Sequence, residues 1–206
     1  MSGDPSPAAS YEAWLVDLDG TLYSPKPLKL AMAAELLLLG LPRLATIRAF
    51  RHEHERIREE GLDAGGDPIG LQLDLASATL GIARDELEAV VREWMVRRPC
   101  RWLPRFRRGA LLEEIAAFRH GGGRTALVSD YPARDKLRAL GAEGLFEEVV
   151  ASGEAGGPAQ LKPSPAGYLA AAERLGVAPE ACLVVGDRDD ADGEAARSAG
   201  MGFRQV

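Results

Sequence analysis

Residues 13–24 read AWLVDLDGTLYS, and this stretch decides the fold. Its first five residues are mostly apolar and end on the carboxylate of Asp17, and Asp19 follows two positions later. The apolar run predicts a buried β-strand. Two acids directly after a strand repel each other unless a positive group lies between them or the pair does chemistry. The stretch therefore predicts a functional site at the end of a strand.

Similar short apolar runs return in the second half of the chain, and helical patterns lie between them. The runs are TALVSD (125–130), FEEVVAS (146–152), CLVVGD (182–187) and GFRQV (202–206). Helical patterns cover residues 104–123, 132–141, 164–176 and 189–200. Continuous apolar runs indicate strands that are covered on both faces, as in a parallel sheet. This alternation predicts a doubly wound α/β fold.

Residues 24–103 break the alternation, because no strand pattern occurs there. Four helical stretches are expected instead, near residues 28–39, 42–60, 68–80 and 84–96. An all-helical block of about 80 residues is therefore inserted between the first strand and the rest of the sheet.

Composition narrows the class of protein. The chain has 206 residues, a net charge of −6 and 46% hydrophobic residues, which is ordinary for a globular protein. The negative charge argues against a general nucleic-acid binder. Cys100 and Cys182 form no metal-ligand or disulfide pattern and suit a reducing compartment. We expect a cytoplasmic protein.

No membrane segment is expected either. Residues 1–10 lack the basic start and apolar core of a signal peptide, and we interpret them as a frayed terminus. The apolar run at 28–41 contains Lys29 and Glu35 and is too short to span a bilayer. Its leucines at 36–39 suit either the core of the helical block or a dimer face, so both a monomer and a homodimer stay open.

Polar groups end several of the predicted strands. Asp17 and Asp19 follow the first, Ser129 ends the second, and Asp187 ends the fourth. Ligands bind at the carboxyl ends of the strands in α/β sheets. Converging carboxylates need a cation, and oxygen ligands favour Mg²⁺. Lys162, one of four lysines in the chain, lies in the loop LKPSP and suits a phosphate beside that cation.

Four motifs resemble those of the haloacid dehalogenase superfamily in type and order: DLDGTLY (17–23), VSD (128–130), LKPSP (161–165) and VGDRDDAD (185–192). The helical insertion stands where subfamily I of this superfamily places its cap. The resemblance implies a Rossmann-like catalytic core formed by residues 1–23 and 104–206, and a helical cap formed by residues 24–103.

The resemblance also implies roles for single residues. Asp17 would be the nucleophile that forms an aspartyl-phosphate. Asp19 would protonate the leaving alcohol and then activate water. Ser129 would hold a phosphoryl oxygen, and Lys162 would neutralise the nucleophile and the phosphate.

A magnesium site is implied by the same resemblance. Asp17 and the backbone carbonyl of Asp19 would contact Mg²⁺, and Asp187 would bind it through its carboxylate. Asp192 would orient Lys162 or a metal-bound water, and Asp190 competes with it for that role. Asp189 is expected to be solvated.

Asp19 favours phosphate ester hydrolysis over dehalogenation, because an alkoxide leaving group needs an acid and a halide does not. The expected activity is Mg²⁺-dependent hydrolysis of a small phosphorylated metabolite. The alternatives are a phosphomutase of the same superfamily and a non-catalytic protein that binds a phosphate ligand.

Two further features have plain interpretations. His52, His54 and His120 are expected to be exposed on helices, and His52 and His54 are not expected to bind a metal together, because positions i and i+2 do not share a helix face. The arginine-rich stretch 97–108 falls where the chain returns from the cap to the core. It is interpreted as a solvated linker, with steering of an anionic substrate as the alternative.

Overall fold

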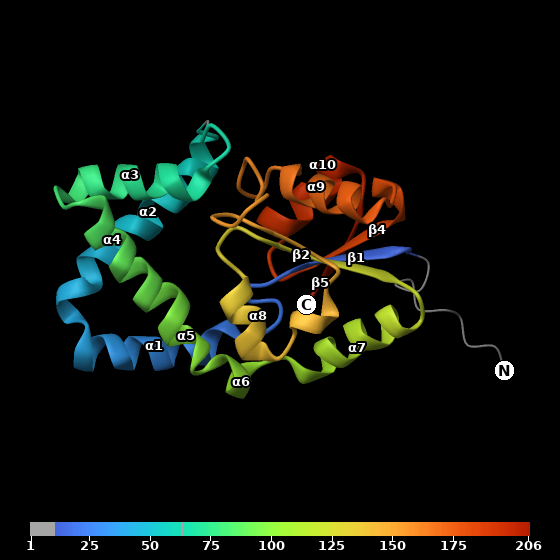
Figure 1. Ribbon diagram of the computed structural model, residues 1–206, viewed down its shortest axis with the longest axis horizontal. Coiled ribbons are helices and arrows are strands. Elements are labelled where there is room, and N and C mark those ends of the chain that lie inside the picture. The colour runs from blue at the N-terminus through green and yellow to red at the C-terminus, as the bar shows by residue number, and fades with distance from the viewer. Residues whose placement is uncertain (1–10, 63) are drawn as a thin grey trace.

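Two groups of secondary structure lie side by side in Figure 1, a twisted sheet with its flanking helices and a group of helices beside it. This computed structural model describes residues 11–62 and 64–206. The predicted frayed terminus, residues 1–10, lies outside the described residues.

The sheet is built around β1 (Ala13–Asp17). β2 (Arg124–Ser129) and β4 (Cys182–Gly186) flank it, and β3 (Glu148–Ala151) and β5 (Gly202–Gln205) lie outside them. All the pairings are parallel, and the order across the described part of the chain is β3-β2-β1-β4-β5. The predicted α/β class is confirmed.

Both faces of β1 are buried, which explains its continuous apolar run. Trp14 and Val16 pack into the apolar cluster on one face of the sheet, and Leu15 packs into the cluster on the other. This alternation follows from the two-residue repeat of a strand. Helices α7 (Gly109–His120) and α8 (Arg134–Leu140) contribute to the first cluster. The second cluster is covered by α9 (Ala166–Leu175) and α10 (Glu194–Ala199).

The helical group follows β1 in the chain. Its elements are α1 (Pro25–Leu39), the 3₁₀ helix η2 (Leu41–Arg43), α2 (Leu44–Glu60), α3 (Pro68–Leu80), α4 (Arg84–Val91), the π-helix η3 (Arg92–Arg97) and α5 (Arg98–Cys100). Phe50, Leu73, Ala76 and Leu87 form its own small core. Helices therefore occur where the sequence predicts them, and the limits of the two domains stay a prediction.

Short helices complete the core: the 3₁₀ helices η4 (Glu143–Leu145) and η5 (Pro179–Ala181), and the π-helix η6 (Asp189–Gly193). Among the described residues no single helix is long and apolar enough to cross a bilayer. The pair Pro25–Leu39 and Leu41–Glu60 meets the length and composition together, but it is bent by 111°.

The single helix predicted over 104–123 is wrong, because two helices occupy this region. α6 (Leu103–Phe106) and α7 are separated at Arg107, which has extended backbone and pairs antiparallel with Tyr23. The backbone N–H of Ser24 donates to the Phe106 carbonyl at 2.9 Å. The two segments that connect core and helical group therefore bind each other, and this pairing breaks the helix.

Candidate active site

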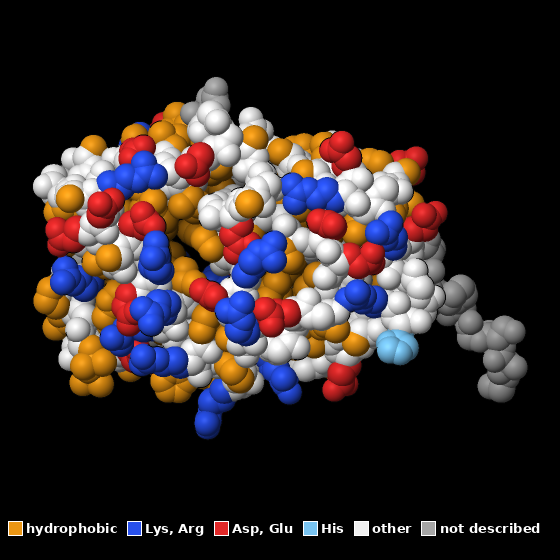
Figure 2. All heavy atoms as spheres, viewed as in Figure 1, with side chains coloured by type: hydrophobic (Ala, Val, Ile, Leu, Met, Phe, Trp, Pro, Cys, Tyr) orange, Lys and Arg blue, Asp and Glu red, His pale blue; other side chains and the backbone are white. Residues whose placement is uncertain are grey.

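The carboxyl ends of β1, β2 and β4 meet at one edge of the sheet, as the sequence predicts. Asp17 ends β1, Ser129 ends β2, and Asp187 directly follows β4. This edge forms one wall of a cavity of about 980 Å³, and α1, α2 and α4 contribute to the opposite wall. In Figure 2 the hollow has orange apolar side chains inside, and blue Lys and Arg side chains gather at its rim.

Asp17, Lys162 and Asp192 form a buried chain of charges. The Lys162 ammonium lies 2.5 Å from Asp17 Oδ1 and 2.8 Å from Asp192 Oδ1. The Thr21 hydroxyl donates to Asp17 Oδ2 at 2.8 Å, and the Tyr168 hydroxyl donates to Asp192 Oδ1 at 2.8 Å. Both oxygens of Asp17 are therefore held in fixed directions.

Within this buried group two carboxylates, Asp17 and Asp192, share one ammonium, that of Lys162. Burial raises the pKa of the Asp17 carboxyl to about 8, the attraction of Lys162 opposes this shift, and the charge of Asp192 adds to it. Burial disfavours the charged form of Lys162, but the charges of Asp17, Asp192 and Asp130 together with Tyr168 outweigh it and raise the pKa of Lys162. Lys162 is therefore a cation, and a second positive charge would stabilise ionised Asp17.

Asp187 completes a group of acids that could hold a metal. One carboxylate oxygen from each of Asp17, Asp187 and Asp192 lies within 4.8 Å of the others. Asp187 packs against Gly20, whose φ is +100° and whose Cα has no room for a side chain. Burial and the charge of Asp192 raise the pKa of Asp187. Three crowded oxygen donors of this kind fit Mg²⁺.

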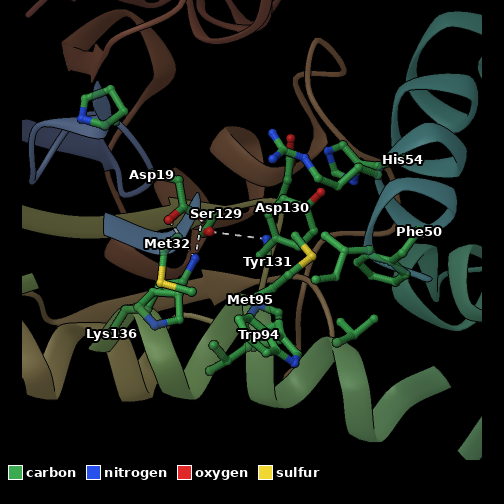
Figure 3. A pocket seen from close by; sticks show the side chains of 18 of the residues that line it. Asp19, Met32, Phe50, His54, Trp94, Met95, Ser129, Asp130, Tyr131 and Lys136 are labelled. Carbon is green, nitrogen blue, oxygen red and sulfur yellow. Dashed lines mark hydrogen bonds and ion pairs between the residues drawn. The ribbon is translucent and has the colours of Figure 1, made fainter. Parts of the chain in front are cut away.

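Asp19 lines the same cavity as Asp17. It has its own cation, Lys136 (Figure 3). The Lys136 ammonium lies 2.6 and 2.7 Å from the two carboxylate oxygens, and the Tyr23 hydroxyl donates at 2.5 Å. Burial disfavours the charged form of Asp19, but Lys136, the Tyr23 hydroxyl and Lys162 together outweigh burial and lower the pKa of Asp19. In this conformation Asp19 is an ionised acceptor, ready to take a proton.

Ser129 and Asp130 organise the next loop. Ser129 Oγ accepts the backbone N–H of Tyr131 at 3.2 Å (Figure 3). Asp130 Oδ1 accepts the backbone N–H of Lys162 at 3.1 Å, so it fixes the loop that carries the lysine. Ser129 is thus brought to the site with Asp17 and Lys162, and its role toward phosphate stays a prediction.

Of the two acids that competed for contact with Lys162, the structure brings only Asp192 to it. Asp190 is exposed, and the Arg188 guanidinium lies 2.6 Å from its carboxylate. Asp189 is also exposed and pairs with Arg197 at 2.9 Å. In the π-helix η6 the side chain of Asp192 is buried, and Asp192 Oδ2 accepts the backbone N–H of Arg188 at 3.2 Å.

The prediction that His54 is exposed is wrong. His54 is 5% exposed, its ring stacks on Tyr131 at 4.5 Å, and Nδ1 lies 3.3 Å from Gln72 Oε1. Burial lowers the pKa of His54. His54 shares the buried side of α2 with Phe50 and Ile57, and the charged residues next to it in the sequence hide this position.

Arginines of the stretch 97–108 contact groups near and far in the chain, and Arg108 donates to the Gly20 carbonyl at 3.2 Å. Arg98 pairs with Glu35 at 2.9 Å and lies over the Trp94 ring, and Arg97 pairs with Glu93 at 3.8 Å. The predicted pairing with acids is found, but Arg98 is only 17% exposed and lies in α5, so it is not a solvated linker residue. Steering of an anionic substrate stays a prediction.

Sequence reasoning missed Lys136 as a site residue. A signal for it exists, because Lys136 lies on the buried face of α8 with Leu137 and Leu140. A lysine on an apolar helix face needs an acid partner. The partner is not visible in the sequence, since it lies 117 positions away.

Fold and site together define a Rossmann-like α/β protein with a helical insertion and a group of acids at the carboxyl edge of its sheet. The model of the haloacid dehalogenase-like hydrolases matches residues 11–200, and the chain belongs to this family. Solved structures agree on the fold. The HAD phosphatase from Thermococcus onnurineus has a TM-score of 0.58 at 19% identity, with 95% of this chain and 86% of that chain covered.

The L-2-haloacid dehalogenase from Xanthobacter autotrophicus has a TM-score of 0.64 at 20% identity, with 95% and 77% covered. A curated relative, the glyceraldehyde 3-phosphate phosphatase of Methanopyrus kandleri, is 48% identical over 67 residues. That match covers 32% of this chain and 28% of the relative. The chain is thus similar both to phosphatases and to a dehalogenase.

Proposed function

We propose that this protein is a Mg²⁺-dependent phosphatase that hydrolyses a small phosphorylated metabolite through an aspartyl-phosphate. The observation that carries the proposal is the second carboxylate, Asp19, in the same cavity as Asp17. A halide leaves without a proton, so dehalogenation makes no use of such a group, whereas an alkoxide needs it. The similarity to the Methanopyrus phosphatase supports the same choice.

In the first step the Asp17 carboxylate attacks phosphorus. The bond between phosphorus and the ester oxygen breaks, and the leaving alkoxide takes a proton from Asp19. Asp19 must therefore take up a proton before this step, against the lowered pKa that it has in the conformation described above. Lys162 stabilises the negative charge of the phosphoryl group from its place beside Asp17. Thr21 keeps the nucleophile oriented.

In the second step water attacks phosphorus of the aspartyl-phosphate. Asp19, ionised since the first step, takes a proton from this water, and the bond between phosphorus and Asp17 breaks. Lys136 binds the ionised form of Asp19 and so stabilises the state that exists between the two steps.

Asp17 and Asp187 would hold Mg²⁺, with the Asp19 carbonyl as a further contact, and Asp192 would orient Lys162. When bound, the cation neutralises the crowded carboxylates and polarises the phosphoryl oxygens. The group of acids and the raised pKa of Asp17 support this assignment.

The test is hydrolysis of a generic aryl phosphate with Mg²⁺, beside release of chloride from 2-chloropropionate. We expect phosphate release by the parent, none by Asp17→Asn, and no chloride. Aryl phosphate hydrolysis at the parent rate by Asp17→Asn refutes the nucleophile assignment. Product analysis with sugar phosphates separates hydrolysis from the phosphomutase alternative, and tight binding without turnover across a phosphate panel supports the non-catalytic one.

A further inference from the structure

The side of α2 that faces the cavity carries three arginines. The α2 residues that line the cavity are Leu44, Ile47, Arg48, Phe50, Arg51, His54, Glu55 and Arg58. Most of them recur every three or four positions, so they form one stripe along the helix. His54 and Phe50 mark this helix in Figure 3, on the opposite side of the cavity from Asp19 and Ser129.

Arg58, at the end of the stripe nearest the α/β core, has both a hydrogen-bond partner and an acid partner. Its Nε donates to the backbone carbonyl of Lys162 at 2.7 Å, and its Nη1 lies 2.8 Å from Glu55. Arg58 therefore fixes the end of α2 beside the loop of the catalytic lysine, and it serves as a reference point for the rest of the stripe.

Arg48 and Arg51 differ from the other arginines of the helical group. Among the described residues, neither has a carboxylate within 4.0 Å or a hydrogen-bond partner, and both are exposed. The other arginines between residues 25 and 100 each have an acid within that distance: Arg43, Arg56, Arg58, Arg84, Arg92, Arg97 and Arg98. The two unpaired guanidinium groups both line the cavity.

These two arginines lie too far along the helix to act on the phosphate at Asp17. At a rise of 1.5 Å per residue, Arg51 is about 10 Å and Arg48 about 15 Å beyond Arg58 along the axis. Phe50 and Met95 line the same cavity and pack together in the small core of the helical group. An anion bound there would belong to a distant part of the same substrate.

We infer that Arg48 and Arg51 form a second oxyanion site, which binds a phosphate or carboxylate at the end of the substrate opposite to the hydrolysed phosphate. The substrate class is then a phosphate monoester with a second anionic group, separated from the first by an apolar or uncharged segment. Guanidinium forks match the geometry of both oxyanions. The inference rests on the proposed function, since it assigns the substrate of the same cavity.

The experiment compares α,ω-diol bisphosphates of increasing chain length with the matching ω-hydroxyalkyl monophosphates and ω-carboxyalkyl phosphates. Arg51→Gln, Arg48→Gln and the double variant are measured for kcat/KM on each series. Arg43→Gln is the matched control, because it removes the same charge from an exposed ion pair outside the cavity. Circular dichroism checks that each variant is folded.

We expect the parent to prefer one of the dianionic series at a chain length that spans the cavity. Each arginine variant should lose roughly 10- to 100-fold in kcat/KM on that series and less than about threefold on the monophosphates. Equal losses on both series overturn the inference, because they indicate a general attraction of anions. Equal kcat/KM of the parent on the dianionic substrates and on the monophosphates also overturns the inference.

Binding separates this inference from the proposed function. Calorimetric titration of Asp17→Asn with the same bisphosphates and monophosphates measures affinity without turnover. If the parent hydrolyses no monoester, the proposed function fails, and a preference for bisphosphates that disappears in Arg48→Gln/Arg51→Gln still supports the second site. If hydrolysis occurs and that preference is absent, the second site alone fails.

Discussion

The Lys136 ammonium lies 2.6 and 2.7 Å from the two carboxylate oxygens of Asp19, although 117 positions separate the residues. The pair joins the loop after β1 to helix α8, and both residues line the cavity. A carboxylate that must change its proton twice in each turnover therefore has a fixed cation beside it.

Replacing Lys136 by Met removes this cation and keeps the length of the side chain. Asp19 then loses the partner that lowers its pKa, so its ionised form is less stable between the two steps. We expect kcat to fall roughly 10- to 100-fold. Rapid-quench kinetics should show slower hydrolysis of the aspartyl-phosphate. Lys26→Met, which removes a lysine outside the cavity, is the control, and an unchanged kcat for Lys136→Met contradicts the prediction.

Tyr168→Phe removes the hydroxyl that Asp192 accepts at 2.8 Å. Asp192 keeps Lys162 and the backbone N–H of Arg188 as partners, so the fold survives. Loss of one buried hydrogen bond costs about 1 kcal/mol in the free energy of unfolding. Urea denaturation measures this loss. Because Asp192 holds Lys162, we also expect a lower kcat at unchanged KM, and a change in KM alone speaks against this role.

Removal of Mg²⁺ by a chelator should stop phosphate release, and added Mg²⁺ should restore it. Asp187→Asn should raise the Mg²⁺ concentration needed for half-maximal activity by roughly tenfold or more, since one of three crowded carboxylates loses its charge. Asp189→Asn changes an exposed acid that pairs with Arg197 and should need no more Mg²⁺ than the parent. Equal Mg²⁺ requirements in both variants would remove Asp187 from the metal site.

Because His54 is buried, we expect the free energy of unfolding to fall as the solution is acidified. Burial lowers its folded-state pKa below the ordinary 6.5, against the opposing charge of Asp130. Below pH 6.5 the unfolded chain therefore binds a proton that the folded protein does not bind. The contribution of neutral His54 is complete above that pH and is lost progressively as the pH falls toward the folded-state value.

Urea denaturation between pH 5 and 8 measures this effect. His54→Gln should flatten the dependence of the free energy of unfolding on pH, because it removes the buried titrating group. His52→Gln, an exposed neighbour on the same helix, should leave the dependence as it is. A parallel change in both variants would assign the effect to another group.

The parts of the fold that follow from sequence are those with local causes. The central strands β1 and β4 are apolar runs in which every residue is buried, and the motif acids stand at their ends, since Asp17 ends β1 and Asp187 directly follows β4. The break between α6 and α7 was missed, because it depends on the pairing of Arg107 with Tyr23 across the inserted helices. Propensity within residues 104–123 carries no trace of that contact.

The same division holds for the candidate site. Asp17, Ser129, Lys162 and Asp187 are brought to one cavity, and each of them stands at a strand end or a motif loop. Lys136 and His54 were missed, because their burial is decided by partners far away in the chain, Asp19 and Tyr131. Their polar side chains are typical of exposed helix positions unless the partner is known.

The position of β1 in the sheet has a consequence for biosynthesis. Ala13 pairs with Arg124 on one side and with Cys182 on the other. At about 5–20 residues per second, roughly 10–30 s pass on the ribosome between the emergence of this strand and that of its second neighbour. Both backbone edges of this apolar segment are open until β2 emerges, and one edge stays open until β4 emerges, so the nascent chain exposes a strand edge that a chaperone could bind.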